Sequence, residues 1–169
     1  VTQPPTDVSA MDGYAVRAGD VGSVPVTLTQ IGESAAGKAF AGSIGPGQTV
    51  RIFTGAPVPK GADAIVIQED TEVSGDQITM TEAATQGRFV RPAGLDFRHG
   101  DVGITANRVL SARDVGLAAA MNVPWLSVTR APRIALLATG DEIVRPGEPV
   151  GPNQIISSNT LALMGLIAA

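Results

Sequence analysis

The chain has 169 residues, 44% of them hydrophobic and 17% charged, so it holds enough apolar material for a core and disorder is not expected. Its 12 basic and 16 acidic residues give a net charge of −4 with no basic run, which argues against a protein that binds nucleic-acid backbones. The lack of cysteine excludes disulfides, thiolate metal sites and cysteine nucleophiles. No apolar stretch reaches the roughly 18–20 residues of a membrane helix and no signal peptide is visible, so we expect a cytoplasmic protein without a membrane partner.

Alternating apolar and polar residues, broken by turns, run from Ser9 to about Arg91 and predict a small β-rich domain, either a barrel or a sandwich. The 20 glycines and 12 prolines also fit short strands joined by tight turns. Strands are predicted around residues 24–28 and 50–53. The run 64–68 and the pair Ile78 and Met80 flank a Ser-Gly-Asp turn at 74–76, which predicts that they form a hairpin.

A helix and a possible strand are predicted in the middle of the chain. Ser111 and Asp114 fit the spacing of a capping box, and an alanine-rich segment follows to Met121. Pro124 ends that helix, and residues 125–129 return to strand-like alternation.

The pattern changes after Pro132. The unbroken apolar run 134–138 is typical of a parallel strand that is covered on both faces. A loop rich in Gly, Asp and Pro follows, and then a helix over 161–169 with N-cap candidates at 157–159. Strand, loop and helix in this order predict the opening of a doubly wound α/β domain.

The ends of the chain predict a piece of a longer protein. The first residue is not Met, and the last helix ends on apolar residues without a capping signal. The alternative is an ordinary docked C-terminal helix.

Three loops carry candidate chemistry. Thr139, Gly140, Asp141 and Glu142 follow the predicted parallel strand, where open α/β sheets bind ligands, and the two adjacent carboxylates can hold Mg²⁺. The segment 54–59 begins with Thr54, whose hydroxyl a rigid Gly-Pro loop could hold against an oxyanion. For both loops a simple surface turn remains the alternative.

Other polar segments are weaker signals. Asp12 with Gly13 is a hairpin-turn signal, Asp96 lies in an ordinary loop, and His99 is expected at the surface because no second His or Cys accompanies it. Residues 32–38 match the phosphate-loop pattern G-x4-G-K, but Ala39 replaces the hydroxyl residue that would bind Mg²⁺. Glycines and a proline at 42–47 forbid the helix that should follow, so a solvated turn carrying Lys38 is preferred.

Taken together, the segments resemble one family. In chain order they are the motifs SAMDGYA at 9–15, RIFTGAPVP at 51–59, ADAIVIQE at 62–69, TGDE at 139–142, PG at 146–147 and SN at 158–159. This set resembles the MoeA family of molybdopterin molybdenumtransferases, which is related to the E domain of gephyrin. The resemblance covers essentially the whole chain.

The resemblance implies an enzyme of molybdenum cofactor biosynthesis that inserts molybdate into adenylated molybdopterin and releases AMP, helped by Mg²⁺. It also implies a homodimer with its active cleft between two protomers. The family's functional residues fall on Asp12, Thr54, Asp96 and Glu142. Asp141 and Glu142 would hold the metal, Thr139, Gly140 and Asp141 would contact the substrate, and Lys38, Arg51 and Lys60 are the basic candidates for its anions.

The resemblance also divides the chain and sets its limits. Residues 1–10 would be the remnant of an N-terminal domain, 11–91 the β-rich domain, 92–130 a helical connector that returns to the N-terminal domain, and 131–169 the start of a truncated molybdopterin-binding α/β domain. The family usually has Gly-Glu-Asp where this chain has Gly94-Leu95-Asp96, so any role of that Glu is absent. Later motifs of the family lie beyond residue 169, so we expect the chain alone to be inactive or badly impaired.

Two other functions are open. A gephyrin-like scaffold without catalysis is the main alternative, although it would have no need for the acids Asp12, Asp96 and Glu142. A phosphate-loop NTPase is the other, and it is disfavoured by Ala39 and the glycines after it.

Overall fold

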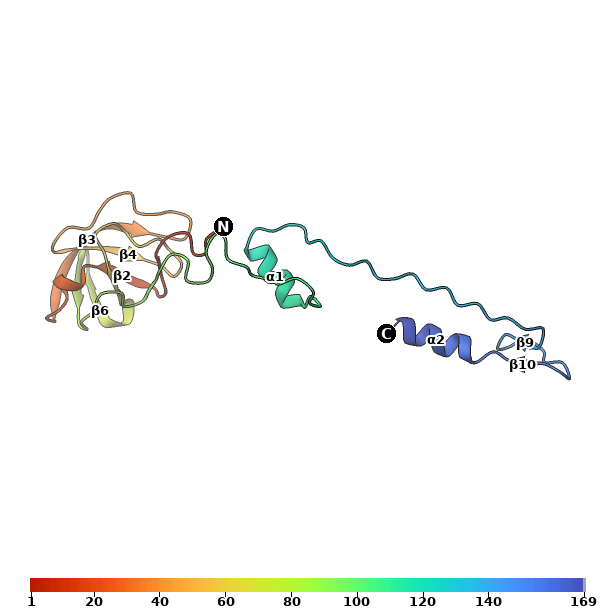
Figure 1. The fold of residues 1–169 in the computed structure, drawn as a ribbon. Helices are drawn as coiled ribbons and strands as arrows, with labels where there is room; N and C mark the ends of the chain where they lie inside the picture. The colour runs from red at the N-terminus through yellow and green to blue at the C-terminus, as the bar shows by residue number, and fades with distance from the viewer. Residues whose placement is uncertain (169) are drawn as a thin grey trace. The chain divides into compact units, whose positions relative to one another are not determined.

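The computed structural model describes residues 1–168, and these form two compact units, Val1–Trp125 and residues 126–168 (Figure 1). The first unit holds β1 (Val8–Ser9), β2 (Gly13–Val16), η1 (Ala18–Asp20), β3 (Val26–Ser34), β4 (Gln48–Ile52), β5 (Ala64–Ile67), η2 (Gln68–Asp70), β6 (Thr71–Ser74), β7 (Gln77–Met80), β8 (Val90–Arg91) and α1 (Ala112–Ala120). The second unit holds β9 (Ile143–Val144), β10 (Ile155–Ile156) and α2 (Asn159–Ala168).

The first unit is built around a six-stranded sheet in the order β5-β2-β4-β3-β7-β6. Neighbouring strands are antiparallel except for β3 and β4, which are parallel and shift register between Gln30 and Glu33. The prediction of a β-rich domain is confirmed, and the strands predicted near residues 26–28 and 50–52 are present as β3 and β4.

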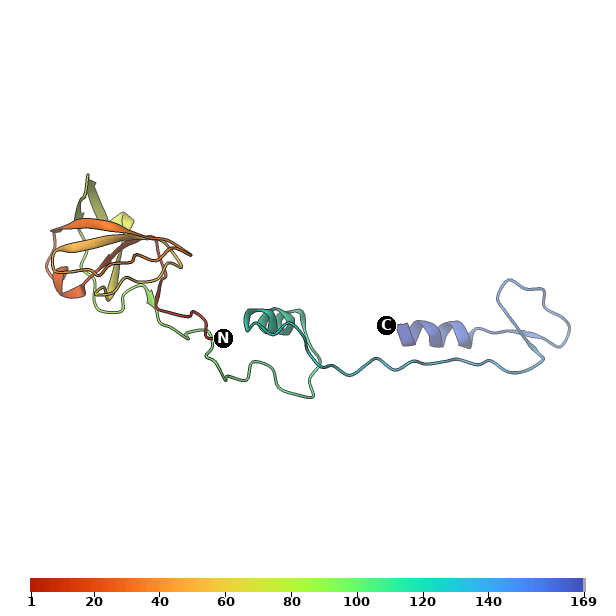
Figure 2. The same ribbon diagram turned by 90° about the horizontal axis from the view of Figure 1, so that it is seen from above.

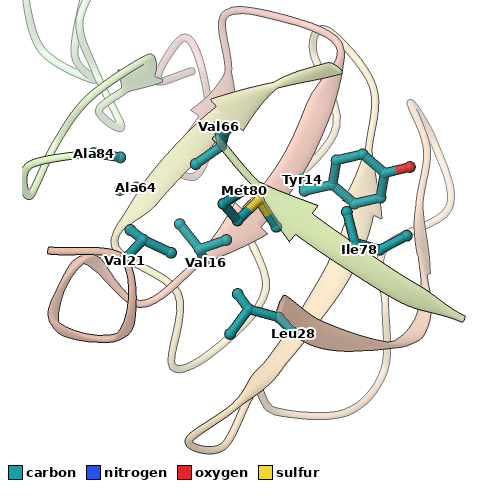
Figure 3. Close-up of a cluster of buried hydrophobic side chains, with 9 residues drawn as sticks. All are labelled: Tyr14, Val16, Val21, Leu28, Ala64, Val66, Ile78, Met80 and Ala84. Atoms are coloured by element: carbon teal, nitrogen blue, oxygen red, sulfur yellow. The ribbon is translucent and has the colours of Figure 1, made fainter. Parts of the chain in front are cut away.

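Side chains from both faces of this sheet are buried. Along β2, Tyr14 and Val16 join one cluster while Ala15 joins the other, as the two-residue period of a strand requires. The first cluster combines residues of β2 and β5 with Leu28 of β3 and Met80 of β7 (Figure 3). Because β4 and β3 separate β2 from β7 in the sheet, this contact requires the sheet to curl around its core.

The predicted hairpin is wrong in its first strand. The turn at Gly75, whose φ is +64°, joins β6 to β7, while β5 pairs with β2 instead. The strand β6 was missed because it reads Thr-Glu-Val-Ser, and Val73 is 61% exposed at the sheet edge. It therefore lacks the apolar alternation that marks a half-buried strand.

Two segments distant in sequence form a stalk of residues 1–9 and 88–97 next to the sheet. Val8 pairs with Arg91 and Ser9 with Val90 between β1 and β8, and an isolated bridge joins Gln3 to Phe97. Figures 1 and 2 show these two segments running together to the N-terminus. The β sheet is thus entered and left by the chain at one place.

The capping box of α1 is confirmed. The Asp114 amide donates to Ser111 Oγ at 3.3 Å, and the Ser111 amide donates to Asp114 Oδ2 at 2.7 Å. These bonds satisfy amides that a helix start leaves without partners.

The second unit differs from its prediction. Residues 134–138 form no strand, and Leu137 is 86% exposed, because no strand within the described residues pairs with this segment. Residues 125–129 are likewise not a strand, and Trp125 is 87% exposed. The predicted C-terminal helix is present as α2, and β9 and β10 form a short parallel pair. The doubly wound domain and the four-part division of the chain stay predictions.

Candidate functional site

The register of the sheet brings Asp12 and Thr54 together. Gly13 is the first residue of β2 and Ile52 the last residue of β4, and the two are paired across the sheet. Asp12 therefore leaves the sheet where Phe53 and Thr54 leave it on the next strand. On the other side of β2, Gly13 lets β5 approach closely, because an added Cβ would lie 2.1 Å from the carbonyl oxygen of Val66.

Two hydrogen bonds fix the pair. The backbone amide of Thr54 donates to Asp12 Oδ1 at 2.7 Å, and the Thr54 hydroxyl lies 2.9 Å from the same oxygen as a second donor. The Thr54 amide, and then its hydroxyl, lower the pKa of Asp12, with a smaller contribution from the positive charge of Arg51. Asp12 is exposed and ionised at neutral pH. In this arrangement the hydroxyl proton of Thr54 is directed at Asp12 rather than at a bound oxyanion.

The loop after Thr54 is held by the stalk. The Gly55 amide donates to the Ser9 carbonyl at 2.8 Å, and the Ser9 amide donates to the Ala56 carbonyl at 2.9 Å. The fully buried Ser9 also donates its hydroxyl to the Met11 carbonyl at 2.6 Å. Gly55 has a φ of +79°, a conformation that favours glycine. The backbone around both Asp12 and Thr54 is thus fixed by bonds on each side.

Arg51 lies on the same face of the sheet as the Asp12 loop. Its guanidinium carbon is 5.0 Å from the centre of the Tyr14 ring and 5.1 Å from that of Phe53. Its Nη2 also donates to Gln68 Oε1. Of the three predicted basic residues, Arg51 alone contributes to the pKa shift of Asp12.

The other predicted residues of the first unit lie elsewhere. Asp96 is in the stalk, where Arg91 Nη2 donates to its Oδ1 at 2.8 Å. Lys38 occupies an exposed turn closed by bonds with Ala35, and no helix follows it, so the phosphate-loop geometry is not formed. Lys60 is exposed, and His99 is at the surface as predicted.

The loop 139–142 belongs to the second unit. All four of its residues are exposed. Gly140 has a φ of +136°, and both carboxylate oxygens of Glu142 lie 2.5 Å from where a Cβ on Gly140 would be. The Glu142 carboxylate therefore folds over a glycine that the backbone requires at this position. The Glu142 carbonyl accepts from the Ile155 amide at 2.7 Å, which ties the loop to β10.

The donor set at Asp141 and Glu142 fits Mg²⁺. Magnesium prefers hard oxygens, takes one or two carboxylates and keeps several waters. Among residues 1–168 no group of three or more His, Cys, Asp or Glu side chains is placed to hold a metal, so water or a substrate would have to complete the coordination.

No helix within residues 1–168 is long and apolar enough to cross a membrane.

The sequence missed residues around the second-unit loop. A hollow of about 600 Å³ adjoins Gly140 and is lined by Arg145, Ser157 and Thr160, together with apolar side chains of α2 and of residues 136–138. Ser157 Oγ and Thr160 Oγ1 are 2.9 Å apart. The sequence predicts N-cap candidates at 157–159 and a family motif at 158–159, but it predicts no site role for Ser157 or Thr160.

Comparisons with known proteins agree on one group of relatives. A sequence model described as "MoeA N-terminal region (domain I and II)" matches residues 1–122. A molybdopterin molybdenumtransferase of Nostoc sp. is 39% identical over 168 residues, which cover 97% of this chain and 38% of the relative. Molybdopterin molybdenumtransferase 2 of Mycobacterium tuberculosis is 38% identical, covering 97% of this chain and 42% of the relative.

Solved structures give the same picture. A crystal structure of a molybdopterin biosynthesis MoeA protein from Pyrococcus horikoshii OT3 has a TM-score of 0.88 at 30% identity, covering 99% of this chain and 46% of that one. A second structure of such a protein from the same species has a TM-score of 0.81 at 35% identity, covering 98% of this chain and 43% of that one. The chain thus spans about two fifths of the length of the curated relatives it matches.

Proposed function

The chain belongs to the MoeA family, and from this membership we propose that it is part of a molybdopterin molybdenumtransferase that acts in molybdenum cofactor biosynthesis. The reaction proposed is insertion of molybdate into adenylated molybdopterin with release of AMP. The whole enzyme is proposed to be a cytoplasmic homodimer. Within the proposal, residues 126–168 open a doubly wound α/β domain whose loop 139–142 contacts the substrate.

The observation that carries the proposal is the Asp12–Thr54 pair. A carboxylate kept ionised by two donors on one oxygen leaves its second oxygen as an acceptor. Oδ2 has no hydrogen-bond partner within residues 1–168, so it can accept from a water or a protonated molybdate oxygen and orient it. A scaffold has no use for an exposed acid fixed in this way, so we favour the enzyme.

Release of AMP breaks the bond between the molybdopterin phosphorus and the bridging oxygen, and that oxygen leaves with AMP. The oxygen of a water or of protonated molybdate forms the new bond to phosphorus, and it loses its proton to solvent or to a carboxylate. Asp12 orients the incoming oxygen, and Thr54 holds Asp12. Mg²⁺ held by Asp141 and Glu142 would neutralise charge on the phosphate oxygens. Asp96 is proposed as a further acid, and Lys38 and Lys60 as the cations available to the anions of the substrate.

The test uses a chimera in which residues 1–169 replace the matching part of the Nostoc relative. Molybdate-dependent AMP release is measured with adenylated molybdopterin and Mg²⁺ for the chimera and for Asp12→Asn, Thr54→Val and Glu142→Gln. Each substitution should lower the rate at least about tenfold, equivalent to about 1.4 kcal/mol. Matched controls are Asp76→Asn in the β6–β7 turn and Thr27→Val, whose hydroxyl bonds only Thr79 across the sheet.

The outcome separates the two functions. If the folded chimera releases no AMP while the intact relative does, the proposed enzymatic function is overturned and the function as a scaffold is favoured. We also propose that the 169-residue chain is inactive by itself, since its relatives use more than twice its length. Release of AMP by the isolated chain at a rate near the relative's would contradict this.

A further inference from the structure

Arg51 is surrounded by fixed groups on three segments. It lies in β4 directly opposite Tyr14 of β2, and directly opposed residues of an antiparallel pair share a face of the sheet. Phe53 lies two residues further along the chain and so on the same face. The guanidinium contacts both rings, and Tyr14 is itself 5% exposed and packed in the cluster of Figure 3.

The third segment is η2. Gln68 begins this turn, and its side-chain oxygen accepts from Arg51 Nη2. The backbone amide of the same Gln68 donates to the carbonyl of Asp12 at 3.2 Å. Gln68 therefore connects the side chain of Arg51 to the backbone of Asp12 through two hydrogen bonds. It is also attached, through Phe53, to the segment that carries Thr54.

We propose that Arg51 is a positioning residue, which joins the ends of β2, β4 and η2 and so holds Asp12 in reach of Thr54. This differs from the role as an anion ligand that its charge suggested. The contacts with two rings and with Gln68 restrict the rotation of the guanidinium. The favourable attraction between Arg51 and the ionised Asp12 acts in the same direction.

The inference rests on the proposed function, because that function gives the position of Asp12 relative to Thr54 its role in the reaction. Its test needs no reaction. Thr54 is an exposed residue, and within residues 1–168 its amide donates only to Asp12, so the hydrogen exchange of this amide reports the pair directly. The Ile65 amide donates from the edge strand β5 to the Arg88 carbonyl of the stalk at 3.0 Å, so its exchange reports the stability of this unit away from the pair.

The experiment measures amide exchange by NMR in the 169-residue chain and in Arg51→Gln, Gln68→Leu and Arg17→Gln. Arg17 follows the other end of β2 and pairs with Asp20 at 3.9 Å, so it is the matched control for loss of a cation. We expect Arg51→Gln to speed exchange at Thr54 about tenfold, with Gln68→Leu smaller but in the same direction. Exchange at Ile65 should stay within about twofold in both, and Arg17→Gln should leave Thr54 unchanged.

Two results would overturn the positioning role. One is unchanged exchange at Thr54 in Arg51→Gln. The other is an equal acceleration at Thr54 and Ile65, because Arg51 would then stabilise the unit in general rather than the pair. If the pair is held as proposed but the chimera releases no AMP, the positioning stands and the proposed function fails, so the two failures are distinguishable.

Discussion

Replacement of Gly13 by alanine tests how closely β2 and β5 approach beside Asp12. An ideal Cβ at this position would lie 2.1 Å from the Val66 carbonyl oxygen and 2.9 Å from the Ile67 Cα. Ordinary contacts between carbon atoms are about 3.5–4.0 Å, so the two strands would have to separate locally by about 1 Å. The obstacle is backbone on both strands, and it cannot be relieved by turning a side chain.

The expected loss in unfolding free energy follows from the hydrogen bonds between β2 and β5. Gly13 pairs with Ile67 and Tyr14 with Val66, and a separation of about 1 Å breaks bonds that start near 2.9 Å. Two lost hydrogen bonds at about 0.5–1.5 kcal/mol each give about 1–3 kcal/mol, in the range found for overpacked sites. The melting temperature should then fall by at least about 2 °C.

The assay is urea unfolding of the 169-residue chain followed by circular dichroism, with a thermal melt as a second probe. Gly19→Ala in η1 is the matched control, because nothing lies within 4 Å of its added Cβ. Gly19→Ala should change the unfolding free energy by less than about 0.5 kcal/mol. If Gly13→Ala were as stable as the control, the close approach of β2 and β5 beside Asp12 would be wrong.

Three further predictions concern other parts of the first unit. The Thr54 amide and hydroxyl lower the pKa of Asp12, so this carboxyl favours folding above its unfolded-state pKa of about 4, and the contribution is lost as pH falls through the folded-state value. Unfolding midpoints measured from pH 6 to pH 2 should therefore fall more for the unaltered chain than for Asp12→Asn, and parallel curves would contradict this. Ser111→Ala should cost about 1 kcal/mol of local helix stability, seen as faster amide exchange in α1, and unchanged exchange would show that the cap is not formed in solution. Ile52→Ala should cost about 2–5 kcal/mol in urea unfolding because Ile52 is fully buried, whereas Val73→Ala at the exposed sheet edge should cost less than about 0.5 kcal/mol, and equal losses would contradict the assigned burial.

The sequence predicted strands in which apolar and polar residues alternate regularly. In β4, Val50 and Ile52 both join the second cluster, and their two-residue spacing is visible without a structure. The strand β2 is buried at all four positions and was not predicted. The edge strand β6 was not predicted, because a polar edge strand carries almost no burial pattern. The hydrophobicity of the run 134–138 predicts a strand, but a strand also needs a paired neighbour, which composition does not encode.

The candidate site was predictable by residue but not by contact. Thr54 stood out in a loop after a predicted strand, Asp12 was only part of a turn signal, and the family resemblance selected both. Their hydrogen bond joins residues 42 positions apart, so it depends on which strands are neighbours and in which register. The role of Gln68 had no sequence signal, since a glutamine at the end of an apolar run is an ordinary strand exit.

The stalk has a consequence for the order in which the chain folds. Its closing contacts span most of the first unit: the Ala93 amide reaches Asp7 across 86 positions and the His99 amide reaches Thr2 across 97. The turn at Gly75, by contrast, closes β6 on β7 within a few residues. The entropy of closing a loop grows with its length, so the local hairpin can form early, while the stalk can close only after the sheet has drawn its two ends together. Because Ser9 of the stalk fixes the loop that carries Thr54, the Asp12–Thr54 pair becomes ordered among the last contacts of the unit, and refolding experiments should find the sheet protected before this pair is.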